Sequence, residues 1–134
     1  MKSQNQNPKN RLAVASAQAV RAGCFLILGI VSGAFGAHAL KGALEPDALG
    51  AFQTASQYLL WMGCGMMAAS SFGQTSGMGW VALGTALFSL SIFALVGLGA
   101  CGIEASWLGP LTPIGGVLMM GGWIQWVRSM WRAR

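Results

Sequence analysis

Long apolar stretches alternate along the chain with short polar or charged segments, and the charged residues mark where each stretch begins and ends. Uncharged runs of 19, 56 and 23 residues lie between Arg21 and Lys41, between Asp47 and Glu104, and between Glu104 and Arg128. A helix that spans a membrane needs about 20 predominantly apolar residues. The first and third runs therefore fit one span each, and the middle run fits two.

Local signals divide the middle run and mark helix starts. Residues 73–79 are polar and rich in glycine, which is typical of a turn. Pro46 and the pair Thr112-Pro113 predict helix starts, with Thr112 as an N-cap and Pro113 as the first helical residue. A β-barrel would need short segments of alternating hydrophobicity, and the sequence has no such pattern. The pattern predicts an all-α integral membrane four-helix bundle, with helices at about residues 22–40, 48–72, 80–100 and 113–127.

Composition excludes two classes of chain. Hydrophobic residues make up 54% of the 134 residues and charged residues 8%, compared with about 25% charged residues in soluble domains. A water-soluble globule needs more charges to cover its surface, and a disordered chain combines low hydrophobicity with high charge. The length fits one domain. We expect a membrane domain at residues 21–128, between a polar, basic N-terminal tail at 1–20 and a basic C-terminal tail at 129–134.

The basic residues predict the orientation in the membrane. With four spans, the two tails and the 73–79 turn share one side. That side carries Lys2, Lys9, Arg11, Arg21, Arg128, Arg132 and Arg134, whereas the other side carries only Lys41. An excess of Lys and Arg marks the cytoplasmic side, so both termini of this multi-pass protein are expected in the cytoplasm. The expected partner is the lipid bilayer and not nucleic acid, because the basic residues form no separate domain.

One alternative concerns the first apolar run. Arg21, the run after it and the small residues around His38 also resemble a secretory signal with a cleavage site after Ala39. The run and its polar lead are both long for such a signal. A permanent first span is therefore favoured.

Small residues recur at helical spacing and predict close helix contacts. Transmembrane helices pack closely where such residues let their backbones approach. We expect these stripes to join helices within one chain or between copies, and a pore lining is the alternative. The stripes are Gly29-Gly33-Ala37 in the first helix, Gly65-Ala69 in the second and Gly115-Gly122 in the fourth.

Groups suited to catalysis or metal binding are scarce. His38 is the one histidine; it is either a proton-responsive or ligand-contacting group, or a polar residue at an interface. One imidazole and three carboxylates form no zinc site, so we expect no metal, no cofactor and no catalytic residue. The three cysteines are expected to be small buried apolar residues. The predicted spans contain no charged residue, which argues against a proton-coupled transporter.

Four ordered segments carry a family resemblance. They are residues 33–40 (GAFGAHAL), 52–55 (FQTA) with Tyr58, 82–89 (ALGTALFS), and 112–116 (TPIGG) followed by 121–123 (GGW). The pattern is similar to that of the YgdD/YwdK family of small bacterial membrane proteins, a domain of unknown function. The resemblance implies a four-helix, multi-pass protein of the bacterial inner membrane (the plasma membrane) without an established activity, whose first helix is a permanent span.

The expected function is a non-enzymatic structural, accessory or partner-binding membrane component. Its partners would be lipid, a second copy or another membrane protein. The alternative is a channel or transporter for ions or small solutes, either alone or as an oligomer. The candidate functional residues form two groups near the outer face: His38 with Gly33, Gly36 and Lys41, and Thr112 with Pro113, Gly115 and Gly116.

Overall fold

The computed structural model describes residues 8–133, and most of this range is helical. A three-residue 3₁₀ helix, η2 (Ser106–Leu108), precedes the last long helix. The all-α prediction is therefore confirmed for the described residues. The four long helices are α1 (Pro8–His38), α2 (Pro46–Ser71), α3 (Met78–Ala100) and α4 (Leu111–Arg132).

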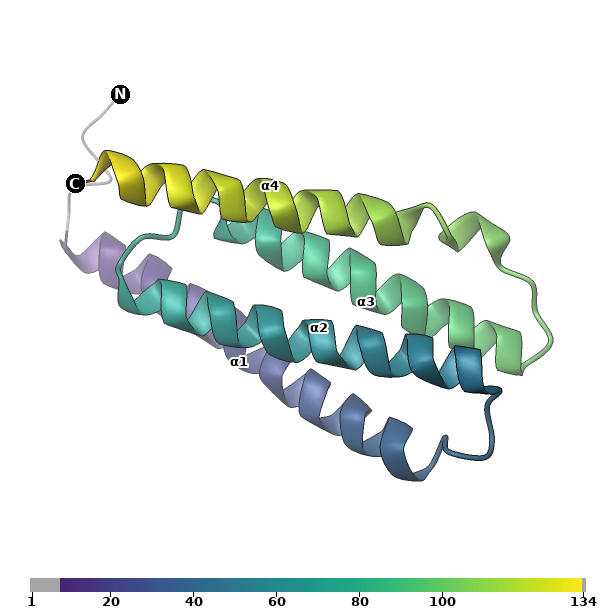
Figure 1. Ribbon diagram of the computed structural model, residues 1–134. Helices are drawn as coiled ribbons and strands as arrows, with labels where there is room; N and C mark the ends of the chain where they lie inside the picture. The colour runs from purple at the N-terminus through teal and green to yellow at the C-terminus, as the bar shows by residue number, and fades with distance from the viewer. Residues whose placement is uncertain (1–7, 134) are drawn as a thin grey trace.

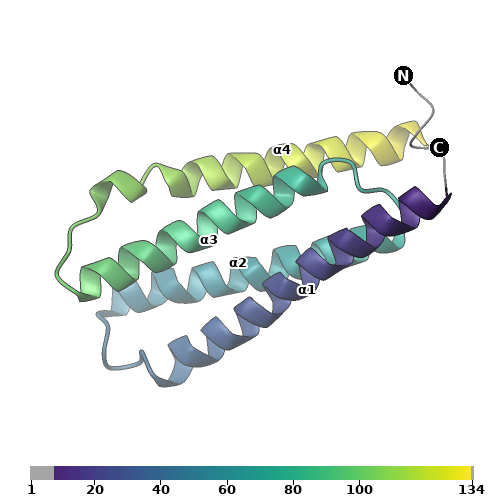
Figure 2. The same ribbon diagram turned by 180° about the vertical axis from the view of Figure 1, so that it is seen from behind.

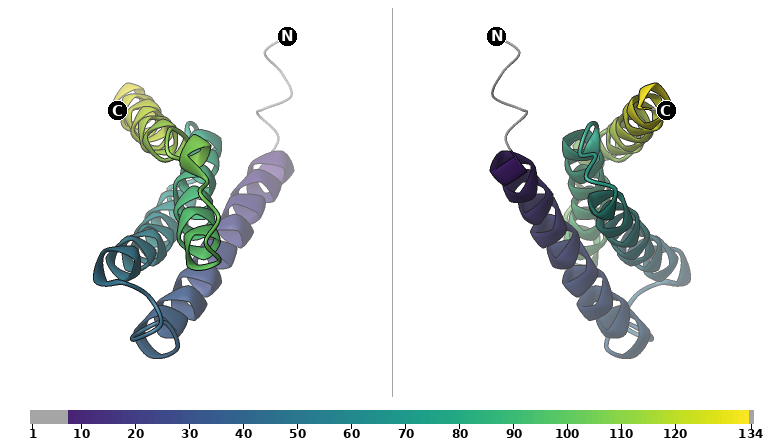
Figure 3. Two further views of the ribbon diagram at one scale, coloured as in Figure 1. Left: turned by 90° about the vertical axis from the view of Figure 1, so that its right-hand side faces the viewer. Right: turned by 90° about the vertical axis from the view of Figure 1, so that its left-hand side faces the viewer.

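The helices pack in chain order as antiparallel neighbours: α1 on α2, α2 on α3, and α3 on α4. Figures 1 and 2 show three features at the same end of the molecule: the start of α1, the turn between α2 and α3, and the end of α4. Seen end-on, α2 and α3 lie between α1 and α4, and α1 is inclined away from α3 (Figure 3). The structure is therefore an open series of helices, in which the first and last helices form no packed pair.

Two helices extend by several residues beyond their predicted ends. α1 begins at Pro8, so residues 8–20, which we expected in a polar tail, are its first turns. α4 continues to Arg132. The predicted ends were set by charge, and a single arginine does not stop a helix. Five alanines between residues 12 and 22 favour helix over coil, because alanine has the highest helix propensity.

The helix starts agree in part with the predicted ones. Pro46 is the first residue of α2, as expected, and Asp47 lies in the first turn of this helix, where the helix dipole favours an anion. α4 starts earlier than predicted, because Pro110 takes the N-cap position. Thr112 is therefore inside the helix, and the prediction that it is the N-cap was wrong.

Two segments of the described chain are long and apolar enough to cross a membrane, Leu12–His38 and Met78–Ala100. Within each segment, the 18-residue apolar stretch that meets this criterion is only 17% and 28% buried, respectively, whereas a core helix of a soluble protein is mostly buried. Large apolar side chains such as Ile27, Ile30 and Leu90 are more than 60% exposed. An exposed apolar surface of this extent fits lipid as the surrounding solvent.

Candidate functional site

Each packed pair of neighbouring helices is joined by one side-chain hydrogen bond. The Gln18 amide nitrogen on α1 donates to the Met66 carbonyl oxygen on α2 at 3.1 Å. Ser89 on α3 donates to the Ala55 carbonyl oxygen on α2 at 3.0 Å. The polar side chains at these positions hold helices together, as expected where apolar burial between helices contributes little.

The third hydrogen bond explains what Thr112 does. Its hydroxyl lies 2.8 Å from the Ser91 hydroxyl, so that α3 and α4 are joined across their interface. Ser91 is buried, and its hydroxyl also donates to the Phe88 carbonyl oxygen at 2.9 Å. Thr112 is therefore a link between helices and not a cap.

Glycines set the distance between α3 and α4. A Cβ atom on Gly115 would lie 2.6 Å from the Phe88 backbone nitrogen and 2.7 Å from the Gly84 carbonyl oxygen. A Cβ atom on Gly122 would lie 2.6 Å from the Gly77 carbonyl oxygen. Both glycines of the predicted α4 stripe therefore contact one face of α3, and the two helices approach too closely for any larger residue.

The stripe predicted on α1 is only partly a contact face. A Cβ atom on Gly29 would meet Leu60 at 2.7 Å, and one on Gly36 would meet Phe52 at 3.1 Å. Nothing lies within 4 Å of the corresponding position on Gly33, and Ala37 is exposed. Gly36 therefore packs against α2, whereas Gly33 makes no close contact there.

The two predicted groups of site residues belong to different surfaces. His38 and Lys41 are exposed, and no hydrogen bond or ion pair is formed by their side chains within the described residues. Thr112 and Gly115 contact α3, whereas Pro113 is exposed and nothing lies within 4 Å of a Cβ position on Gly116. Since α1 and α4 are no packed pair, the fold provides no contact that would join the two groups.

The cysteines also differ from expectation. All three are exposed, so the prediction that they are buried apolar residues was wrong. Cys24 and Cys64 lie on the outer surfaces of α1 and α2, and Cys101 follows the end of α3. They therefore lie on three separate surfaces of the molecule.

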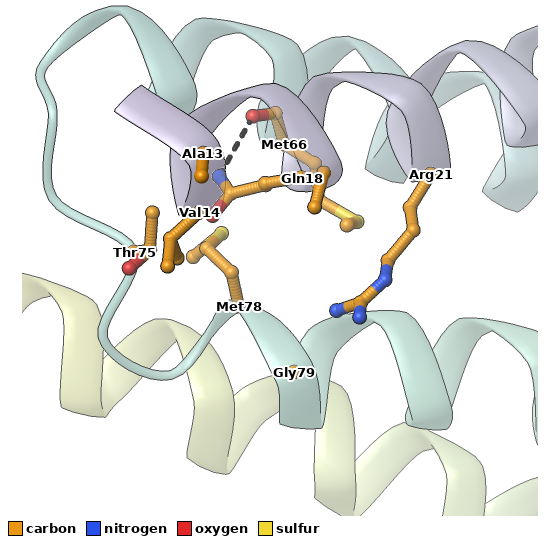
Figure 4. Close-up of a pocket in the computed structure, with 9 residues that line it drawn as sticks. Ala13, Val14, Gln18, Arg21, Met66, Thr75, Met78 and Gly79 are labelled. Atoms are coloured by element: carbon orange, nitrogen blue, oxygen red, sulfur yellow. Dashed lines mark hydrogen bonds between the residues drawn. The ribbon is translucent and has the colours of Figure 1, made fainter. Parts of the chain in front are cut away.

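A hollow that the sequence did not indicate lies where α1 begins. Most of its lining is apolar, and we call it the polar hollow after its polar residues Gln18, Arg21 and Thr75. Its volume is about 310 Å³, and it is lined by residues of α1, α2, the α2–α3 turn and the start of α3. Figure 4 shows Gln18 and Arg21 of α1 on one side, with Thr75 and Met78 across from them. The Gln18 side chain is 4% exposed, and none of the described residues donates a hydrogen bond to its Oε1 atom. The hollow thus combines a buried free acceptor with an exposed guanidinium.

Sequence reasoning missed this site because Gln18 and Arg21 lay at the presumed boundary of a tail. One signal was available: the two residues are three positions apart and share a helix face if the helix continues through them. Alanines at 13 and 17 lie next to that face and leave room for a hollow.

Comparison with known proteins identifies the family. Residues 32–116 match a family model described as a protein of unknown function (DUF423). The chain belongs to the DUF423 family. The matched range contains all eight predicted site residues and does not include Gln18 or Arg21 of the polar hollow.

Curated relatives of this DUF423 protein are named as membrane proteins. The UPF0382 membrane protein SH2409 of Staphylococcus haemolyticus is 31% identical over 81% of this chain and 95% of its own length. YwdK of Bacillus subtilis is 32% identical over 75% of this chain and 89% of its own length. A relative in Schizosaccharomyces pombe is 36% identical over 72% of this chain and 86% of its own length. No solved structure matches. The resemblance to the YwdK-type family is thus confirmed, and the chain is a membrane protein of a family without an assigned function.

Proposed function

We propose that this protein is a non-enzymatic component of the bacterial inner membrane that crosses the bilayer four times and binds a second copy of itself through α2. The inner face would hold both chain ends. Two features support this orientation. α1 begins and α4 ends at the same end of the molecule (Figure 1), and Arg21, Arg128 and Arg132 lie toward that end, as expected of cytoplasmic segments.

The observation that carries the proposal is an exposed pair of amides on α2. Gln53 and Gln57 are one turn apart and both exposed, and within the described residues their side chains form no hydrogen bond. α2 has 26 residues and is therefore about 39 Å long. Gln57 is the twelfth residue of this helix and lies near its middle, so it is well inside a hydrocarbon layer of about 30 Å. An unpaired amide at that depth costs several kcal/mol.

A second copy supplies the missing hydrogen bonds most simply. An amide carries both donors and an acceptor, so a glutamine can pair with the same glutamine across a two-fold axis, where each copy presents the same face. Cys64 lies two turns beyond Gln57 on this face and is exposed. Its small side chain lets two helices approach closely.

The interior supports a structural role over a transport path. Gln18, Ser89 and Ser91 use their buried polar groups to join neighbouring helices. A hollow midway along the helices, about 340 Å³ in volume, is lined almost entirely by apolar residues of α1, α2 and α3. A solute path would need polar groups at this depth.

Oxidative crosslinking in native membranes tests the dimer. The variant with Cys24→Ala and Cys101→Ala keeps only Cys64, and we expect it to form a disulfide-linked species of twice the chain mass. Matched variants that keep only Cys24 or only Cys101 should remain monomeric under the same oxidation. Gln57→Leu in the Cys64-only chain should reduce the crosslinked fraction severalfold.

Other results would contradict the proposal. Equal crosslinking through all three cysteines would indicate random collision in the membrane. A disulfide-linked species whose mass is not twice the chain mass would show that Cys64 contacts another membrane protein and not a second copy. Full crosslinking of the Gln57→Leu variant would show that the glutamine amides do not hold the two copies together.

A further inference from the structure

The polar hollow at the start of α1 contains an acceptor that the helix packing does not use. Gln18 is only 4% exposed, and its Oε1 atom has no hydrogen-bond donor among the described residues. A buried carbonyl oxygen without a partner costs about 1–3 kcal/mol. Because Oε1 itself has less than 1 Å² of accessible surface, a donor in the hollow reaches it only after the neighbouring side chains shift, and the unpaired acceptor favours that shift.

The orientation of the Gln18 amide is fixed by its neighbour. The Met66 carbonyl oxygen can only accept a hydrogen bond, so the amide nitrogen of Gln18 must face it, at 3.1 Å. Turning the amide over would place two acceptors together. Oε1 consequently points away from Met66, toward the side of the hollow where Val14 and Met78 lie (Figure 4).

Arg21 adds a positive charge at the edge of the same hollow. It is exposed and lies one turn beyond Gln18 on α1, and its side chain extends across the hollow toward α3 (Figure 4). A guanidinium presents several donors in a plane that matches two oxygens of a phosphate. The hollow therefore offers donors for an anion at its edge, and its wall covers an acceptor that a hydroxyl or ammonium group can reach once the neighbouring side chains shift.

The size and depth of the hollow fit a lipid headgroup. Its volume of about 310 Å³ exceeds by far the roughly 10–15 Å³ that one water requires and reaches the lower limit of small-molecule sites, about 300 Å³. From Ala22 to the end of α1 are 17 residues, about 26 Å of helix. This length nearly spans the hydrocarbon layer of about 30 Å, so Arg21 lies at headgroup level.

We propose that the hollow binds the headgroup of an anionic phospholipid that carries a hydroxyl, with phosphatidylglycerol as the simplest example. Arg21 binds the phosphate, and a headgroup hydroxyl donates to Oε1 of Gln18. The acyl chains leave along the apolar surface of α1 toward the middle of the helix, where Ile27 and Leu28 are 63% and 52% exposed. This inference rests on the proposed membrane orientation, since it needs Arg21 at a lipid–water interface.

Titration of the purified full-length chain in detergent, read by native mass spectrometry, tests the site. We expect one phosphatidylglycerol to bind at concentrations where phosphatidylcholine, which has neither net charge nor a donor, does not. Arg21→Gln should weaken this binding about tenfold or more, the effect of losing a charge-assisted hydrogen bond. Arg128→Gln is the matched control, because it removes an exposed arginine at the same end of the molecule, and it should bind normally.

A second pair of variants fills the hollow without changing charge. Gly79 lines the hollow, and nothing lies within 4 Å of the position that its Cβ would take. Gly79→Leu should therefore fold and block the lipid. Gly97→Leu is the control on the same helix, because the Cβ position of Gly97 is equally open and it lies outside the hollow.

Three outcomes would overturn the inference. Equal binding of phosphatidylcholine and phosphatidylglycerol would remove the role of charge. An equal loss in Arg21→Gln and Arg128→Gln would indicate diffuse attraction to a basic surface. Binding of soluble glycerophosphoglycerol as tight as that of the lipid would assign the site to a soluble phosphate ester. Each of these outcomes leaves the Cys64 crosslinking result intact, so failure of the lipid site and failure of the dimer are distinguishable.

Discussion

The contact between α3 and α4 yields a prediction that separates two adjacent glycines. A Cβ added to Gly115 would lie 2.6 Å and 2.7 Å from backbone atoms of α3, whereas a Cβ added to Gly116 would meet nothing within 4 Å. The sequence alone treats the two residues alike, as neighbours in one motif. The structure predicts that Gly115→Ala and Gly116→Ala have opposite effects on stability.

The magnitudes follow from the geometry. Ordinary van der Waals contact begins at 3.4 Å, so Gly115→Ala requires α3 and α4 to separate by about 0.8 Å, because backbone atoms cannot move aside as a side chain can. Overpacking of this kind costs about 1–3 kcal/mol. Separation also lengthens the 2.8 Å contact between Ser91 and Thr112. Gly116→Ala has no such cost and gains about 0.5–1 kcal/mol in helix propensity.

Unfolding in mixed detergent micelles measures the difference. The free energy of unfolding would be determined for the three chains by titration with a denaturing detergent, followed by the helical circular dichroism signal. We expect Gly115→Ala to fall below the unmodified chain and Gly116→Ala to equal or exceed it. If Gly115→Ala is as stable as Gly116→Ala, α3 and α4 do not pack as described.

Three further predictions follow from single contacts. In a double-mutant cycle, Ser91→Ala and Thr112→Val should show a coupling free energy of about 0.6 kcal/mol, the mean for hydrogen bonds between membrane helices; additive effects would contradict a direct bond. Gly77→Ala should unfold at a markedly lower detergent fraction than Gly73→Ala, because both residues have positive φ angles, 82° and 64°, but only Gly77 also contacts the backbone of Gly122. His38→Ala should change the free energy of unfolding by less than about 0.5 kcal/mol, because His38 is exposed at the end of α1; a larger loss would mean that it has a partner.

Charge predicted the number of helices but not their ends. Gaps between charged residues gave four helices, because an apolar run of sufficient length has few alternatives to a helix in lipid. A helix end depends instead on local capping and on tertiary contacts. Gln18 contacts the backbone of α2, which extends α1 into residues that composition assigns to a tail. The polar hollow could not be predicted from the sequence for this reason, because its residues on α1 were assigned to the tail or to its boundary.

Thr112 shows a different limit of sequence reasoning. A threonine before a proline fits the start of a helix locally, but the N-cap position went to Pro110, two residues earlier. Within the helix the Thr112 hydroxyl meets Ser91, which lies 21 positions away in the sequence. A local sequence pattern cannot show a contact between residues that far apart. The role of Thr112 is therefore visible only once the packing of α3 against α4 is known.

The spacing of the glycines explains why both members of the stripe predicted on α4 are in contact, whereas the stripe predicted on α1 is a contact face only in part. Residues four apart on an α-helix differ by about 40° around its axis, whereas residues seven apart differ by about 20°. A contact that continues over two turns therefore prefers a spacing of seven. Gly29 and Gly36 on α1 contact α2, while Gly33, at a spacing of four, makes no close contact.

The same spacing sets the register of α3 against α4. Gly77 faces Gly122 and Gly84 faces Gly115. Moving seven residues toward the C-terminus on α3 therefore matches moving seven residues toward the N-terminus on α4. Two antiparallel helices in contact have this relation between their residue numbers. A larger residue at any of these four positions meets backbone on the facing helix, so the four glycines constrain the α3–α4 contact jointly. Their spacing, visible in the sequence, is the feature from which this half of the fold can be predicted.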